Sequence, residues 1–174
     1  AELIQGCALA ALGRAEEGLP LLHRGLAVTR AIGQALHLPQ ALTMLAYAYG
    51  KAGQPEEGLR RLAEAAEIAA MTQDRWAESE SCRLRGDLLL ATGRAPEAEN
   101  SFREALSVAQ RQHGRLWELR AALSLARLWH GEGRNEEART LLQPIYGWFT
   151  TAVRTPDLEE AEELLGRLQL APHR

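Results

Sequence analysis

The hexapeptide GRAPEA at residues 93–98 decides the fold, because closely similar hexapeptides recur at a fixed interval along the chain. The others are GRAEEG at 13–18, GQPEEG at 53–58 and GRNEEA at 133–138, so the leading glycines, at positions 13, 53, 93 and 133, are evenly spaced. A regular period of about 20 to 50 residues is typical of proteins built by stacking one small unit on the next. The sequence therefore predicts a repeat protein rather than a closed globule.

Small and large side chains keep the same register around each of these glycines. Before the glycine, a small residue at position −7 and a large one at −4 form the pairs Gly6 and Leu9, Ala46 and Tyr49, Gly86 and Leu89, and Ala126 and Trp129. After it, a small residue is followed four positions later by a large one in the pairs Gly18 and Leu22, Gly58 and Leu62, Ala98 and Phe102, and Ala138 and Leu142. Spacings of three, four and seven residues place side chains on one face of a helix. Each 40-residue unit is therefore predicted to be a hairpin of two helices.

The helix ends follow from proline, glycine and acidic residues. We expect first helices at about 2–12, 40–52, 77–92 and 116–131, and second helices at about 15–33, 55–72, 95–112 and 135–149. Pro55 and Pro96 stand at helix starts, where proline is tolerated, whereas Pro144 lies inside a predicted helix and should cause a kink or a restart. Gly114 is expected to mark the third bend between hairpins. Thr155, Pro156 and the acidic residues that follow predict a last helix over 155–168, whose apolar face closes the stack.

Composition excludes several classes of function. A net charge of −3 and a pI near 6.0 give no electrostatic footprint for nucleic acid or for an anionic membrane. Cys7 and Cys82 have neither metal-like nor disulfide-like spacing, so we expect reduced thiols in a cytoplasmic protein. We expect neither direct nucleic-acid binding nor membrane association.

No motif for catalysis or cofactor binding stands in the sequence. There is no Walker-type phosphate loop, and the five histidines show no metal-ligand or nucleophile spacing. The acidic pairs at the starts of second helices are explained by the helix dipole, and packing is a simpler account of the four tryptophans than an aromatic cage. We therefore expect no enzyme, no catalytic residue, no metal and no cofactor.

The fullest copy of the pattern, in Gly86, Leu89, Gly93, Ala98, Phe102 and Ala105, resembles the tetratricopeptide repeat (TPR). The period is longer by six than the repeat of that family, which has about 34 residues. The resemblance implies an all-α, TPR-like solenoid of about four helical hairpins with a C-terminal capping helix. We expect one repeat domain over 1–174, with repeats at about 1–36, 37–76, 77–116 and 117–154 and the capping helix at 155–168.

A narrower resemblance rests on residues 118–129, 137–139, 144–150 and 155–158. These segments are similar to the C-terminal repeat region of large bacterial signalling ATPases, which carry an upstream nucleotide-hydrolysing module and often a nucleotide-cyclase or a DNA-binding effector of the LuxR type. The resemblance implies a regulatory module in signal transduction. It implies neither ATPase nor cyclase activity for these residues.

The candidate site follows from the TPR resemblance, because the first helices of such stacks line the concave side. The positions there that packing does not require are Thr43, Tyr47, Lys51, Glu80, Arg83, Asp87, Arg120, Arg127 and His130. Arg120 and Arg127 could hold a ligand carboxylate, or the set could form an intramolecular network of salt bridges. We expect a peptide or protein partner, including neighbouring domains of the same polypeptide. A small effector in the groove and self-association through residues 1–12 remain open as alternatives.

Overall fold

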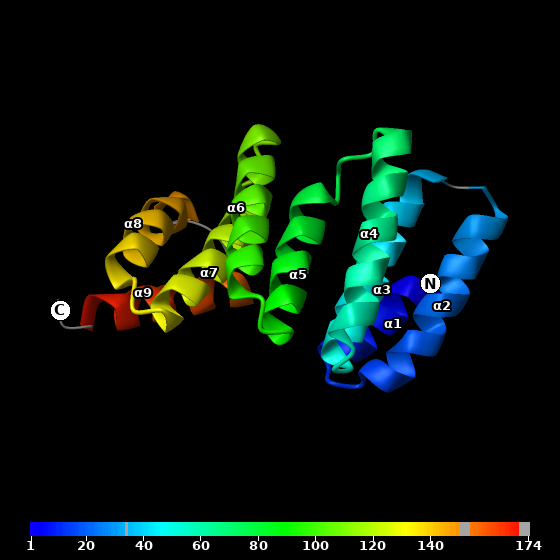
Figure 1. Cartoon of the computed structure of the whole chain (residues 1–174), viewed down its shortest axis with the longest axis horizontal. Coiled ribbons are helices and arrows are strands. Elements are labelled where there is room, and N and C mark those ends of the chain that lie inside the picture. The colour runs from blue at the N-terminus through cyan, green and yellow to red at the C-terminus, as the bar shows by residue number, and fades with distance from the viewer. Residues whose placement is uncertain (34, 150–153, 171–174) are drawn as a thin grey trace.

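The computed structural model describes residues 1–33, 35–149 and 154–170, and within them it contains α-helices, two short 3-10 turns and no strand. The first four helices are α1 (Glu2–Ala11), α2 (Ala15–Ala31), α3 (Leu38–Lys51) and α4 (Pro55–Thr72). The others are α5 (Glu78–Ala91), α6 (Ala95–Arg111), α7 (Arg115–Gly131), α8 (Asn135–Tyr146) and α9 (Pro156–Leu170). Figure 1 shows the helices side by side along one long axis, with α1 and α2 at one end and α8 and α9 at the other. The predicted all-α solenoid of stacked hairpins is confirmed.

The turns inside the hairpins have the backbone that the glycine period predicts. Gly13, Gly53, Gly93 and Gly133 all have φ between 71° and 79°, a left-handed conformation that glycine adopts without steric cost. Gly114 marks the third bend between hairpins as predicted, because it lies between the end of α6 and the start of α7. The left-handed residue at that bend is His113, with φ 54°, and Gly114 has φ −85° and precedes the first residue of α7.

The structure assigns no interruption of the helix at Pro144, so the kink or restart expected there stays a prediction. Pro144 lies within α8, two residues before its end, and the chain continues as a 3-10 turn over Gly147–Phe149. The helix stops at Tyr146 rather than reaching residue 149. Residues 150–153, at the end of the fourth predicted repeat, and the tail 171–174 lie outside the described residues.

Glycine lets the two helices of a hairpin approach closely. A Cβ on Gly18 would lie 2.4 Å from the carbonyl oxygen of Gly6, so α1 and α2 cross backbone to backbone. In the third hairpin, a Cβ on Gly86 would lie 2.3 Å from the ring of Phe102, which is fully buried. The alternation of small and large residues in the sequence therefore determines how the two helices of each hairpin pack.

The buried side chains divide the molecule into two blocks. The N-terminal block, α1 to α4, shares a core of leucines and alanines that includes Leu22, Leu42 and Leu45. The C-terminal block, α5 to α9, shares a larger core with Phe102, Trp129 and the leucines of α9. Between them lies a small cluster, here called the middle joint, made of Ala46, Leu62, Leu84 and Leu88. Leu84 and Leu88 of α5 pack there against α3 and α4.

Helix α9 closes the C-terminal end as predicted. Leu158, Ala161, Leu165 and Leu168 are buried, together with Leu164. The N–H of Leu158 donates to Thr155 Oγ1 at 3.4 Å, which is the expected N-cap contact. Among the described residues, no helix is long and apolar enough to cross a membrane.

Candidate functional site

The first helices of the hairpins place most of the predicted site residues along one hollowed face. Three adjoining cavities of about 350, 220 and 480 Å³ are lined by residues of α1, α3, α5, α7 and α9, with Phe102 of α6 behind the third. We call these three cavities the groove. Its lining includes eight of the nine predicted residues: Thr43, Tyr47, Lys51, Glu80, Arg83, Asp87, Arg120 and Arg127. His130 lines none of these cavities; it lies in the last turn of α7, where its Nδ1 is 2.7 Å from Oδ1 of Asn135, the first residue of α8.

Aromatic side chains line the cavity of about 350 Å³ at one end of the groove. Trp76 and Trp117 meet edge to face with ring centroids 6.1 Å apart, and Tyr47, Met44 and Cys7 line the same cavity. The Trp76 side chain is 62% exposed, so the interpretation of this residue as packing was wrong. An exposed tryptophan beside a mostly apolar cavity is a surface that can hold an apolar group of a partner.

Packing does explain a different tryptophan. Trp129 is only 6% exposed, and its indole N–H donates to Glu99 Oε1 at 2.9 Å. Arg103 and Arg134 lie against the two sides of this network, with guanidinium carbons 5.0 and 4.8 Å from the Trp129 ring centroid. Trp129 therefore belongs to the core of the C-terminal block and not to the groove.

Arg83 organises the charged floor of the groove. Its guanidinium donates to Glu80 Oε2 at 2.9 Å and to Glu80 Oε1 at 2.8 Å, and it donates to Asp87 Oδ2 at 2.6 Å. Burial lowers the pKa of Arg83, but the bonds to both carboxylates outweigh it and raise the pKa above its ordinary value. Arg83 therefore stays charged and holds both carboxylates in place.

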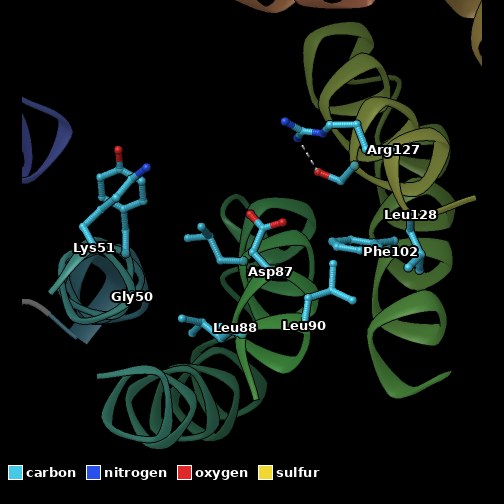
Figure 2. A pocket seen from close by; sticks show the side chains of 12 residues that line it. Gly50, Lys51, Asp87, Leu88, Leu90, Phe102, Arg127 and Leu128 are labelled. Carbon is cyan, nitrogen blue, oxygen red and sulfur yellow. Dashed lines mark hydrogen bonds between the residues drawn. The ribbon is translucent and has the colours of Figure 1, made fainter. Parts of the chain in front are cut away.

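Asp87 is the second carboxylate that Arg83 holds. Burial raises the pKa of Asp87 above its ordinary value, although Arg83 and Arg127 both act to lower it. Figure 2 shows Asp87 on α5 between Lys51 of α3 and Arg127 of α7, above Leu88 and Leu90. This third cavity, of about 480 Å³, is therefore lined by both charged and apolar side chains.

Helix α9 supplies carboxylate partners for Arg120 and Arg127, the two arginines read from the sequence either as ligand-binding or as part of an intramolecular network. Arg120 Nε donates to Asp157 Oδ1 at 3.3 Å, and its Nη1 lies 3.5 Å from Glu80 Oε1. Arg127 pairs with Glu160 and also donates to Ser124 Oγ at 3.3 Å. The structure therefore shows Arg120 and Arg127 in an intramolecular network, the second of the two interpretations.

Thr43 and Lys51 differ in what they can offer. Thr43 is buried, and its hydroxyl is engaged with Pro39 O at 2.8 Å and Ser81 Oγ at 2.7 Å, so it holds α3 against α5. Lys51 is exposed, with its ammonium 5.5 Å from the Tyr47 ring centroid. Within the described residues no carboxylate forms an ion pair with Lys51, so this cation faces solvent.

Sequence reasoning missed the aromatic end of the groove and the acidic side chains of α9. Trp76 and Trp117 stand nearly one repeat apart, close to the starts of two first helices, and this repetition was the available signal. Asp157 and Glu160 gave no local signal, because their partners lie on α7, far away in the chain. Across residues 1–33, 35–149 and 154–170, no group of three His, Cys, Asp or Glu side chains could hold a metal ion.

Comparison with known proteins agrees with this geometry. Residues 39–64, 79–104 and 119–144 match the family model of the tetratricopeptide repeat. Each segment starts in a first helix and ends in the second helix of the same hairpin. No curated protein matches the chain.

Solved structures with the same arrangement come from kinesin light chain-like proteins. Two crystal structures of nearly identical TPR-like repeats, from a putative kinesin light chain of Podosopora anserina, superpose with TM-scores of 0.72 and 0.71. Each is 20% identical and aligns with 96% of this chain, over 82% and 83% of the solved chain respectively. BtubC (BKLC) from P. vanneervenii gives a TM-score of 0.66 at 14% identity, over 97% of this chain and 83% of that one. At these identities the likeness concerns the fold alone, and together with the repeat matches it shows that the chain carries tetratricopeptide-like repeats.

Proposed function

We propose that this chain is a non-catalytic interaction module that binds a peptide or protein segment in the groove. TPR repeats generally mediate protein–protein interaction, and their fold typically serves as a scaffold rather than as a catalyst. The observation that carries the proposal is the cavity of about 350 Å³ walled by Trp76, Trp117 and Tyr47. A partner would insert one apolar side chain there, while the rest of it lies along the first helices.

The charged floor supports this assignment by giving the groove a fixed shape. Arg83 holds Glu80 and Asp87, and Arg120 holds Asp157, so the side chains that line the groove are already ordered by bonds to each other. A preorganised surface loses little conformational entropy when a partner binds. Affinity would therefore come from the apolar anchor more than from the arginines.

Binding of selected peptides tests the proposal. Twelve-residue peptides selected on the wild-type chain from a random phage library would be labelled, and their affinities measured by fluorescence anisotropy. Trp76→Ala should weaken binding by about 30-fold or more, because a buried aromatic anchor contributes about 2 kcal/mol or more. Trp148→Ala is the matched control, since this side chain is 67% exposed and lines none of the three cavities. Equal affinities for wild type and Trp76→Ala would remove the groove as the binding site.

A small effector in the same cavity is a second candidate, because about 350 Å³ lies within the range of small-molecule sites. Such a ligand at 100 times its Kd would stabilise the chain by about 2.7 kcal/mol. A thermal-shift screen of metabolites should then give hits that Trp76→Ala abolishes and Trp148→Ala keeps. A screen without hits would leave only the peptide or protein partner.

The resemblance of residues 118–129 and 155–158 to bacterial signalling ATPases supports a regulatory context for this binding. We place the module in a larger polypeptide, where it passes the binding event to a nucleotide-hydrolysing module. The coding sequence upstream of Ala1 tests this directly. A Walker-type loop there would support the context, and an upstream region without one would contradict it.

A further inference from the structure

The two ends of the stack have opposite surfaces. At the C-terminal end, the outward side of α9 carries exposed charges at Glu159, Glu162, Glu163 and Arg167. At the N-terminal end, four large apolar side chains are exposed, Ile4 by 72%, Leu12 by 74%, Val28 by 55% and Ile32 by 60%, beside an ion pair between Arg24 and Glu2. We call Ile4, Ala8, Leu12, Val28 and Ile32 the end face.

The end face lies on the side of the first hairpin that points away from the second. On α2, His23 meets Tyr49 of α3 and Arg30 pairs with Glu64 of α4, so this side of the helix faces the second hairpin. At about 100° per residue, Val28 and Ile32 point about half a turn away from Arg30. On α1, Ile4, Ala8 and Leu12 recur at a spacing of four residues and form one stripe. The stripe contains no charged residue, although an exposed helix surface is normally polar.

The same positions in later hairpins form the contacts between neighbouring hairpins. Forty and eighty residues after Ile4 stand Met44 and Leu84, and after Ala8 stand Ala48 and Leu88. Ala48 is fully buried in the core of the N-terminal block, while Leu84 and Leu88 are buried against Ala46 and Leu62 of the hairpin before them. Val108, which is the equivalent of Val28, is only 1% exposed. Within this fold, side chains at these positions therefore pack against the hairpin that precedes their own.

We propose that the end face binds a further helical hairpin of the same 40-residue type, packed as the hairpins are at the internal joints. A helix with apolar residues on two sides requires a partner on both. Helix α1 has α2 and α3 on one side and solvent over Ile4, Ala8 and Leu12. The inference is independent of the groove, because the end face shares no residue with the lining of the three cavities.

The internal joints also indicate which residue sizes fit in a hairpin that covers the end face. At the middle joint, Leu88 lies over Gly50 and Gly58, where an added Cβ would come within 2.7 and 2.8 Å of the leucine methyl groups. The end face carries Ala8 at the register position of Leu88, so these two positions of a covering hairpin can hold glycine or alanine. In the first hairpin of this chain they are Ala10 and Gly18, and Ala10 already shares one core with Ala48, the equivalent of Ala8 in the second hairpin.

A tandem duplication within the full chain tests the proposal. A second copy of residues 1–40 would be placed directly before Ala1, so that the added α2 meets the original α1 in the 40-residue register. We expect one cooperative unfolding transition and a Tm at least about 3 °C higher, the shift that about 1 kcal/mol produces in a chain of this size. Two separate transitions, or an unchanged Tm, would overturn the proposal.

One substitution placed in either copy provides the matched control. Ile4→Glu in the original copy, which is now internal, should lower Tm by about 6 °C or more, because it buries a charge at a joint. The same change in the added copy, which is now terminal, should shift Tm by no more than about 2 °C. Equal effects in the two copies would show that no joint had formed.

Sedimentation of the 174-residue chain tests the alternative that a second copy of the chain covers the end face. The proposal expects a monomer at micromolar concentration in both the wild type and the Ile4→Glu variant. A dimer that Ile4→Glu abolishes would show instead that a second copy of the chain covers the end face, through residues 1–12. That result would overturn the hairpin as the occupant.

Discussion

The N-terminal and C-terminal blocks are built from the same repeat and differ in how they fill its core. In the C-terminal block, Phe102 and Trp129 stand at the large positions, and one continuous core extends from Leu89 to Leu168. In the N-terminal block, leucines and alanines make up the core together with Tyr49, the equivalent of Trp129. The cluster of the middle joint is smaller: Ala46, Leu62, Leu84 and Leu88 are its buried members, and Tyr47 and Leu59 pack against it. Leu84 and Leu88 also line one cavity, and Leu62 lines another. The 40-residue pattern therefore specifies the hairpin, while the individual side chains decide how firmly neighbouring hairpins are joined.

Truncation at the large position should show the largest difference between the two regions. Phe102→Ala is expected to lower the free energy of unfolding by about 3–5 kcal/mol, because it leaves a cavity under Gly86 in the closed core. Leu62→Ala, at the same register position in the middle joint, should cost about 2–3 kcal/mol, since it removes a smaller side chain beside an existing cavity. Urea unfolding measures both. A larger loss for Leu62→Ala than for Phe102→Ala would reverse the ranking of the two regions.

Replacing Gly18 tests the close crossing of α1 and α2 in the N-terminal block. Gly18→Ala should destabilise the chain by about 1–3 kcal/mol, because the new Cβ would meet the main-chain oxygen of Gly6, which cannot move independently. Gly131→Ala is the control at the last residue of α7, where a Cβ would meet no atom within 4 Å. This variant should be neutral or gain up to about 1 kcal/mol from helix propensity. Similar effects of the two substitutions in thermal unfolding would contradict close packing of α1 on α2.

Acid unfolding should identify a charge network that belongs to the C-terminal block alone. Burial raises the pKa of Glu99, but hydrogen bonds from Arg134, Trp129 and Arg103 outweigh it and lower the pKa to about 2 from an ordinary 4.5. Its contribution to stability is therefore present above about pH 4.5 and is lost as the pH falls toward 2. Glu99→Gln should flatten this part of the stability curve in urea titrations between pH 5 and pH 2.5.

Glu163→Gln supplies the control for that experiment, because Glu163 is an exposed carboxylate on α9. It should leave the shape of the acid limb unchanged. Parallel curves for wild type and Glu99→Gln would show that the network around Trp129 does not stabilise the folded chain.

Cysteine reactivity gives the smallest and most local measurement. Burial raises the pKa of Cys82 to about 11 and also raises the pKa of Cys7, so both should react with a disulfide reagent more slowly than free cysteine at pH 7.5. Cys7 lines the groove, whereas Cys82 lines the other cavity, together with Leu62 of the middle joint. Leu88→Ala should accelerate the reaction of Cys82 and leave that of Cys7 unchanged. Acceleration at both sites would mean that the whole chain opens rather than the joint.

The sequence predicted those features that depend on local pattern. The hairpins, the left-handed turn glycines and the buried face of α9 all follow from spacing within about one helix or one repeat. Eight of the nine predicted site residues also line the groove, since the register of a first helix fixes which side chains face away from the core.

The remaining features depend on contacts that no local pattern contains. The pairing of Arg120 with Asp157 requires knowledge of where α9 packs, beyond the intervening helix α8. Trp76 precedes the start of α5, so helical register could not say whether it points into the core or over the groove. Both features belong to the groove, where distant partners as well as the repeat position the side chains.

The bends between hairpins carry one more regularity. Residues 33, 73 and 113 are evenly spaced and all have positive φ, of 68°, 58° and 54°, yet they are glycine, glutamine and histidine. A side chain held in this region costs about 1–2 kcal/mol, so the surrounding stack must enforce the conformation at Gln73 and His113. The periodicity of this protein is thus maintained by the torsion angles of its main chain, and the amino-acid identities can diverge around it.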